Sequence, residues 1–179
     1  ILFDSTNQAS HLVLAAEEGA AVTLHAATDA AALVVTDGDV ILEDLELTGA
    51  QDTPAIVVSG GRLAVRRCRL RGNDGRGAIY VTGGELEVED SDLTGNRHSG
   101  GGEGGAGGAL YVPGGELEID DGGPTGNRHS GGGEGGAGGA LAVTGGASVL
   151  LRRSNITENR AAVGGGLHVS GAATLVRLE

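Results

Sequence analysis

Residues Thr94 to Leu110 read Thr-Gly-Asn-Arg-His-Ser-Gly-Gly-Gly-Glu-Gly-Gly-Ala-Gly-Gly-Ala-Leu, and the same seventeen residues recur without change as Thr125 to Leu141. They belong to a 31-residue unit that is written twice, from Ala78 to Gly108 and from Ala109 to Gly139. A unit that recurs at a fixed period is the sequence signature of a stacked repeat architecture. We therefore predict a solenoid, whose architecture is easier to derive from the sequence than its function.

Weaker copies of the unit extend in both directions. They share a small residue, an apolar-x-apolar triplet, a Gly turn, a second alternating segment and an apolar residue three positions before Asn. The triplets begin at Leu33, Ile56, Ile79, Leu110, Leu141 and Leu167, with spacings of 23, 23, 31, 31 and 26 residues. Together with a short first copy at Leu12 to Leu14 and Val22 to Leu24, this predicts about seven units.

Short segments with period-2 alternation occur in each unit. Leu86 and Val88 point one way, whereas Glu85, Glu87 and Glu89 point the other. Strict alternation indicates strands, and the absence of apolar residues at helical spacing disfavours leucine-rich and helical repeats. Three short strands and two turns fit one 23-residue unit. We predict an all-β, single-stranded parallel β-helix with three short strands per coil and coils stacked roughly 4.8 Å apart.

The whole chain, residues 1–179, is expected to form one β-helix domain. Residues 1–32 match the pattern least and are predicted to form irregular N-terminal coils. Residues 33–179 are predicted to form regular coils, with Gly-rich loops at 97–107 and 128–138.

Asparagines recur at one position of the unit, after its last strand. They are Asn73, Asn96, Asn127 and Asn159. An inward amide at a tight turn can satisfy backbone groups of the coils above and below, so we predict an asparagine ladder. Cys68 aligns with Ser91 and Ser154, which predicts a small core residue rather than a nucleophile.

These motifs resemble the right-handed parallel β-helix of the pectate-lyase-like superfamily, and most closely its polymorphic outer membrane protein repeats. The matching segments are Gly107-Gly108-Ala109-Leu110, Gly138-Gly139-Ala140-Leu141, Leu70-x-x-Asn73, Leu93-x-x-Asn96 and Ile156-x-x-Asn159. Leu or Ile stands where that family has Phe, and Pro124 stands there before Asn127. The resemblance implies a right-handed coil, in line with the rule for parallel crossovers. It is poorly specific for activity, because one fold hosts many functions.

The composition limits the possible partners. Twelve basic residues, all Arg, stand against twenty-four acidic ones, for a net charge of −12. Nucleic acid is excluded as a partner because it requires a basic face. No apolar segment reaches the roughly 20 residues of a membrane span. Because no initiator Met or signal peptide precedes Ile1, we expect a segment of a longer, exported protein.

Acidic side chains form like-charged rows when the units are aligned. The row members are Glu85, Glu87, Glu89, Asp90, Glu116, Glu118, Asp120 and Asp121. Hard cations such as Ca²⁺ prefer carboxylate oxygens, so this cluster is the candidate calcium site. The alternative is a solvated acidic face relieved by flanking Arg rows, and it requires no cofactor.

A second candidate metal set lies in the Gly-rich loops. The repeat brings His98 over His129 and Glu103 over Glu134, and His with Glu could hold Zn²⁺. The alternative is a plain surface loop, since repetition aligns these residues whether or not a metal binds.

Two aromatic side chains also align. Tyr80 is expected to lie outward over Tyr111, where two phenols could form a small glycan platform. Exposed strands commonly carry Tyr for its β-propensity alone, and this is the alternative.

The functional choice is between a scaffold and an enzyme. The resemblance to polysaccharide lyases and glycosidases implies a Ca²⁺ site or paired carboxylates acting on acidic glycans. Here the acidic residues follow the repeat instead of breaking it, and no residue matches a lyase motif. We therefore expect a non-enzymatic structural or adhesive domain at a bacterial cell surface. Its expected partners are surface glycans or proteins, and further coils or subunits at its open ends.

Overall fold

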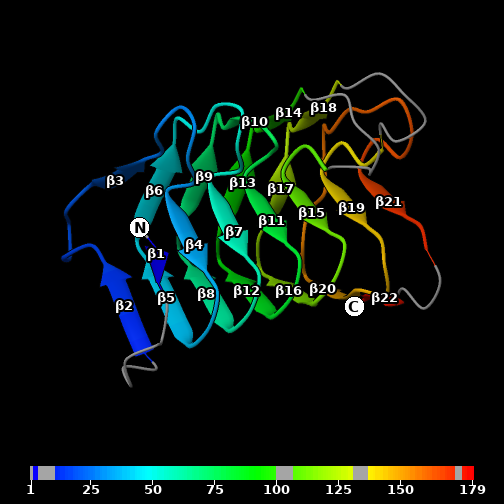
Figure 1. Ribbon diagram of the computed structural model, residues 1–179. Coiled ribbons are helices and arrows are strands. Elements are labelled where there is room, and N and C mark those ends of the chain that lie inside the picture. The colour runs from blue at the N-terminus through cyan, green and yellow to red at the C-terminus, as the bar shows by residue number, and fades with distance from the viewer. Residues whose placement is uncertain (1, 4–10, 100–106, 131–136, 172–174) are drawn as a thin grey trace.

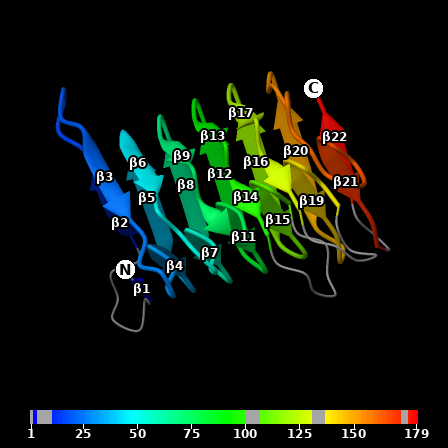
Figure 2. The same cartoon turned by 90° about the horizontal axis from the view of Figure 1, so that it is seen from above.

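The computed structural model of this chain describes residues 2–3, 11–99, 107–130, 137–171 and 175–179. These residues form strands, turns and bends but no helix, so the described protein is all-β. The strands build four open sheets in which neighbouring strands run parallel. Successive strands follow one another along a single axis, and the two termini lie toward its opposite ends (Figure 1 and Figure 2).

We name the sheets A to D. Sheet A contains, in spatial order, β1 (Leu2–Phe3), β4 (Leu33–Val35), β7 (Ile56–Val58), β11 (Ile79–Val81), β15 (Leu110–Val112), β19 (Leu141–Val143) and β21 (Leu167–Val169). Sheet B contains β2 (His11–Ala15), β5 (Asp39–Glu43), β8 (Arg62–Arg66), β12 (Glu85–Glu89), β16 (Glu116–Asp120), β20 (Ser148–Arg152) and β22 (Leu175–Leu178).

The other two sheets are smaller. Sheet C contains β3 (Val22–His25), β6 (Leu45–Thr48), β9 (Arg69–Arg71), β13 (Asp92–Thr94) and β17 (Gly123–Thr125). Sheet D contains the two-residue strands β10 (Asp74–Gly75), β14 (Arg97–His98) and β18 (Arg128–His129). Sheet D was not predicted: the sequence indicated three strands per unit, and the central repeats have this short fourth one.

The chain visits sheets A, B and C in the same order in repeat after repeat, an arrangement consistent with a β-solenoid. The register is the one that the spacing predicted, since the residues that open the triplets are direct partners in sheet A. This row runs Leu33, Ile56, Ile79, Leu110, Leu141 and Leu167. The first 32 residues, expected to be irregular, supply the strands β1, β2 and β3.

Inward rows of apolar side chains form the core. Alternate residues of each sheet B strand are buried, so that Leu42, Val65, Val88 and Ile119 form one continuous inward row. The turn between sheets A and B requires glycine for two reasons. Gly84 has a φ of +76°, and a Cβ there would clash with the carbonyl oxygen of Gly61 in the preceding repeat.

The asparagines form a hydrogen-bonded ladder beside this core. The amide nitrogen Nδ2 of Asn73 donates to Oδ1 of Asn96 at 2.9 Å, and the same bond joins Asn96 to Asn127 at 3.1 Å and Asn127 to Asn159 at 3.0 Å. Each Oδ1 also accepts a backbone N–H one repeat back, and each Nδ2 also donates to a backbone carbonyl. The amide of Asn96 thus makes all four of its possible hydrogen bonds within the protein.

Replacing Asn96 with Ala is expected to lower the free energy of unfolding by about 3 kcal/mol, because it leaves several buried polar partners unsatisfied. Urea unfolding of both proteins measures this difference. Asn155, which is exposed, is the matched control, and Asn155→Ala should change the stability by less than about 0.5 kcal/mol. Equal effects of the two substitutions would contradict a stabilising ladder.

Candidate functional site

Charged residues cover the outer face of sheet B in rows that follow the register. Glu85 is the direct partner of Glu116, and Glu87 is the partner of Glu118. Glu89 faces Asp120 in the same way. The strands β12 and β16 therefore bring together the like-charged carboxylates that the sequence placed in register.

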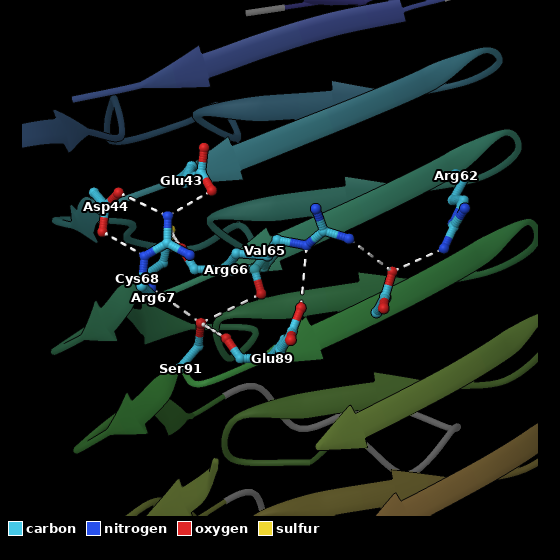
Figure 3. A network of polar contacts seen from close by, with 10 residues as sticks. Glu43, Asp44, Arg62, Val65, Arg66, Arg67, Cys68, Glu89 and Ser91 are labelled. Carbon is cyan, nitrogen blue, oxygen red and sulfur yellow. Dashed lines mark hydrogen bonds and ion pairs between the residues drawn. The ribbon is translucent and has the colours of Figure 1, made fainter. Parts of the chain in front are cut away.

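Arg side chains from the neighbouring strand β8 pair with the carboxylates of β12. The Arg62 Nη2 atom lies 2.8 Å from Oε2 of Glu87, and the Arg66 Nε atom lies 3.2 Å from Oε2 of Glu89. Figure 3 shows the two guanidinium groups reaching across from β8 to the carboxylates of the next strand. Glu85 lies at a longer distance of 3.9 Å from Arg62.

The opposite side of the acidic rows has a second set of Arg partners. Arg152 Nη1 lies 2.6 Å from Oε1 of Glu118. Arg153 Nη2 lies 2.6 Å from Oδ1 of Asp120 and 3.0 Å from Oδ2 of Asp121. The carboxylates of β12 and β16 thus have Arg side chains on both sides, from β8 on one side and from Arg152 and Arg153 on the other. These positive charges reduce the repulsion between the carboxylates.

Six of the eight candidate calcium ligands therefore have an Arg partner. Glu116 and Asp90 have no ion pair within the described residues. In the same part of the chain, no group of three or more His, Cys, Asp or Glu is arranged to hold a metal ion. Most carboxylates of the acidic face are thus engaged in ion pairs with Arg side chains of neighbouring strands.

One row of charged residues occupies a backbone corner between sheets B and C. All five members, Asp44, Arg67, Asp90, Asp121 and Arg153, have positive φ angles between 43° and 57°. This left-handed backbone conformation is uncommon for residues other than Gly, Asn and Asp. In Figure 3, Arg67 reaches back to both Glu43 and Asp44 in the preceding repeat. Its hydrogen bond to Asp44 lowers the pKa of that carboxyl group.

A groove of about 760 Å³ lies along this corner row. Its lining includes residues 16–23, Asp44, Arg67 and Asp90 of the corner row, and Arg69 and Asp92 of sheet C. A second hollow of about 360 Å³ also borders Asp92 and is lined by Asp121, Arg153 and Asn155. Asp90, Asp92 and Arg69 line the groove, and none of the three forms an ion pair within the described residues, so these charges are available to a ligand.

Cys68 lies beside the groove but is buried within the fold. Its backbone N–H donates to Oγ of Ser91 at 3.0 Å, and its thiol lies 3.2 Å from the carbonyl oxygen of Arg66. Burial raises the pKa of the Cys68 thiol, which keeps it protonated and unreactive. The contacts with Ser91 are those of a small core residue (Figure 3).

The two histidines of sheet D stack on each other. The rings of His98 and His129 lie 4.7 Å apart with 17° between their planes, and the residues are 8% and 6% exposed. Neither Nδ1 atom has a hydrogen-bond partner. Burial, together with the charges of His129 and Arg76, lowers the pKa of His98 to about 4. The pKa of His129 is lowered by burial.

Glu103 and Glu134, the other two members of the predicted zinc set, lie outside the described residues. The described half of the set has an arginine neighbour, since the charge of Arg76 contributes to the lowered pKa of His98. A guanidinium close to the imidazoles opposes the binding of a cation.

Tyr80 and Tyr111 also stack, with ring centroids 5.2 Å apart and planes 6° from parallel. Each ring therefore covers one face of the other. Partial burial raises the pKa of Tyr80, with a further contribution from Tyr111. A sugar stacks on the face of an aromatic ring, so this mutual covering reduces the area that the pair offers to a glycan.

No protein-family model, curated protein or solved structure matches this chain. Within the described residues there is no helix that is long and apolar enough to cross a membrane.

Two features of the site were not predicted from the sequence. One is the left-handed corner row, for which the recurring Asp44, Asp90 and Asp121 were an available signal because Asp tolerates positive φ. The other is the groove, which is lined by residues 16–23 together with residues of later repeats and has no local sequence signal.

The buried histidines predict a pH dependence of stability. The pKa of His98 is lower in the folded protein than in the unfolded chain, so the unfolded chain binds more protons below pH 6.5. The contribution of the neutral histidines to the free energy of unfolding should be complete above pH 6.5 and decrease as the pH falls toward 4. The slope should be up to about 1.4 kcal/mol per pH unit for each proton. Urea unfolding at a series of pH values measures this slope.

The double variant His98→Gln/His129→Gln should have a flatter profile in this range. His168→Gln, at a partly exposed position in sheet A, is the control and should keep the slope of the original protein. A profile as steep in the double variant as in the original would show that other groups cause the acid sensitivity.

Proposed function

We propose that this chain is a right-handed parallel β-helix of about seven coils, of the pectate-lyase-like type with polymorphic outer membrane protein repeats. The parallel sheets visited in a constant order support this assignment. A further support is the right-handed preference of parallel crossover connections.

We further propose a non-enzymatic structural or adhesive role, as a stalk or passenger segment of an exported bacterial surface protein. The observation that carries this proposal is that charged side chains form ion pairs between neighbouring repeats. Arg62, Arg66, Arg67, Arg152 and Arg153 all pair with carboxylates of a neighbouring repeat, and so hold successive strands together. Enzyme sites are normally places where the local pattern is broken for function.

The core supports the same role. Its inward rows and the asparagine ladder continue from repeat to repeat, so each added repeat lengthens the protein and enlarges its outer surface. A long surface of this kind suits binding to surface glycans or proteins through many weak contacts. It requires no cofactor.

The corner groove favours one alternative, a lyase or glycoside hydrolase that acts on acidic glycans. The carboxylates of Asp90 and Asp92 are candidates for acid–base chemistry or Ca²⁺ binding, and Arg69 beside them could bind a uronate. In that case Ca²⁺ would be the cofactor, held in the groove rather than on the paired acidic rows.

A depolymerisation assay on a panel of acidic polysaccharides tests the choice. Absorbance of unsaturated uronates and the release of reducing ends are followed with Ca²⁺ and with EDTA. We expect no product under either condition, because the proposed function involves no bond cleavage. A product that depends on Ca²⁺ would contradict the structural role.

Matched variants then locate any activity that is found. Asp90→Asn/Asp92→Asn removes the two unpaired groove carboxylates, whereas Glu116→Gln removes an unpaired carboxylate outside the groove. Activity lost in the first protein and kept in the second would establish the groove as an active site. Equal activity in both would show that the groove carboxylates take no part in the cleavage.

A further inference from the structure

The first residues of the sheet D strands belong to an exposed row that ends in three arginines. In the register of neighbouring repeats this row runs Gln51, Asp74, Arg97, Arg128 and Arg160. All five residues are exposed. The strands β10, β14 and β18, which carry the middle of the row, lie side by side along one edge of the stack (Figure 1). We call Arg97, Arg128 and Arg160 the arginine row. At roughly 4.8 Å per repeat, its three members follow one another over about 10 Å.

The arginine row lacks the opposite charges that accompany most other arginines of the protein. The arginines that form an ion pair are Arg62, Arg66, Arg67, Arg71, Arg97, Arg152, Arg153 and Arg177. Those without an ion pair within the described residues are Arg69, Arg76, Arg128 and Arg160. In sheet C, Arg69 still stands between Glu46 and Asp92. The other three gather at sheet D, since Arg76 forms a backbone bridge with His98.

Only the first member of the arginine row has partners in the described part of the chain. Arg97 Nη1 lies 3.6 Å from Oδ2 of Asp74, and Arg97 Nε donates a hydrogen bond to Oγ of Ser130 at 3.0 Å. Within the same residues, the guanidinium groups of Arg128 and Arg160 have neither a hydrogen bond nor an ion pair. Their N–H donors therefore face outward and are available to a ligand.

This arrangement departs from the rule that the other charged rows follow. Where carboxylates face one another in sheet B, Arg side chains of neighbouring strands pair with them, as Arg66 does with Glu89. Like charges on directly paired positions destabilise a sheet. Arg128 and Arg160 are paired positions of this kind, and no described carboxylate compensates them. A local cost that the rest of the structure leaves uncompensated is typical of a functional site.

The geometry of the row specifies an extended ligand with closely spaced negative charges. A guanidinium group is a planar fork that can bind a carboxylate or a similar oxyanion through two parallel hydrogen bonds. Three such groups in a line fit a chain that carries an anionic group on each successive unit, as an acidic polysaccharide does. Single-stranded nucleic acid is also anionic, but its bases stack on aromatic side chains. Phe3, Tyr80 and Tyr111 all lie in sheet A and not beside this row.

We propose that the arginine row binds the carboxylate or sulfate groups of an acidic polysaccharide without cleaving it. The polysaccharide lies along the axis of the stack, with one anionic group against each guanidinium group. Arg76 adds a further positive charge beside the row. The site lies on sheet D, whereas the corner groove is lined by residues of sheets B and C and their connections. The inference rests on the proposed adhesive role and names its ligand.

Surface plasmon resonance on immobilised polysaccharides gives the first test. Heparin carries mainly sulfate, alginate carries carboxylate, and dextran is uncharged. The protein should bind heparin, alginate or both at low salt, which shows the kind of anionic group, and should not bind dextran. Binding should be lost at about 1 M salt, where the Debye length is roughly 3 Å. No binding to either acidic polymer, equal binding to dextran, or tighter binding to a single-stranded DNA oligonucleotide overturns the proposal.

Substitutions then locate the binding. Arg128→Gln removes one free guanidinium group and should weaken binding by about tenfold or more. Arg128→Lys keeps the charge but loses the planar fork, so its affinity should lie between the two. Arg71→Gln is the matched control, because it removes the same charge from an exposed Arg that pairs with Glu46 in sheet C, and it should leave the affinity unchanged.

Two outcomes of this comparison contradict the site. An equal loss in Arg128→Gln and Arg71→Gln would show that net charge alone governs binding. A loss in Arg69→Gln with Arg128→Gln unchanged would place the ligand in the corner groove.

Stability supplies a readout that does not depend on the ligand. Because Arg128→Gln relieves the repulsion within the row, it should raise the urea concentration at the midpoint of unfolding. A lower midpoint would mean that Arg128 has a structural role, and would overturn the proposal. The depolymerisation assay keeps the two levels of inference apart. Cleavage of the polysaccharide contradicts the structural or adhesive role, whereas absence of both cleavage and binding overturns only the arginine row as a site.

Discussion

Parallel, in-register pairing is the constraint on which the structure depends. It places each side chain beside its own equivalent in the next repeat, at roughly the 4.8 Å spacing of neighbouring strands. Whether such a row is stable depends on how a side chain interacts with an identical side chain. Leucine and valine pack, and asparagine forms hydrogen bonds with asparagine. Tyr80 and Tyr111 stack for the same reason.

Charged residues are the difficult case under this constraint, because a carboxylate beside an identical carboxylate repels it. The protein accommodates this by placing Arg rows on both sides of the acidic rows, as Arg66 does for Glu89 and Arg152 does for Glu118. The pairs are solvent-exposed, so each contributes only a fraction of a kcal/mol to stability. Their larger effect is on register. A slip by one residue would turn the charged side chains of a strand toward the core and its apolar side chains toward solvent, so the ion pairs would be lost.

The repeat made the register predictable from the sequence. Once Ile79 and Leu110 are aligned, the partners Glu85 and Glu116 or His98 and His129 follow without further information. The strands of sheet D did not follow, because two residues in a Gly-rich segment carry no alternation. The left-handed corner was also missed, since Arg67 and Arg153 disfavour positive φ and adopt it only because the stack holds every repeat in the same turn. The lack of a partner at the histidine Nδ1 atoms depends on three-dimensional surroundings that no spacing encodes.

The asparagine ladder has a direction. Every link donates from the Nδ2 atom of one residue to the Oδ1 atom of the next one toward the C-terminus, from Asn73 through to Asn159. A repeat added in the same orientation extends this series without altering any existing bond. A repeat added in reverse would set two donors or two acceptors against each other inside the core. The ladder therefore favours repeats that continue in one orientation, as the similar units 78–108 and 109–139 do.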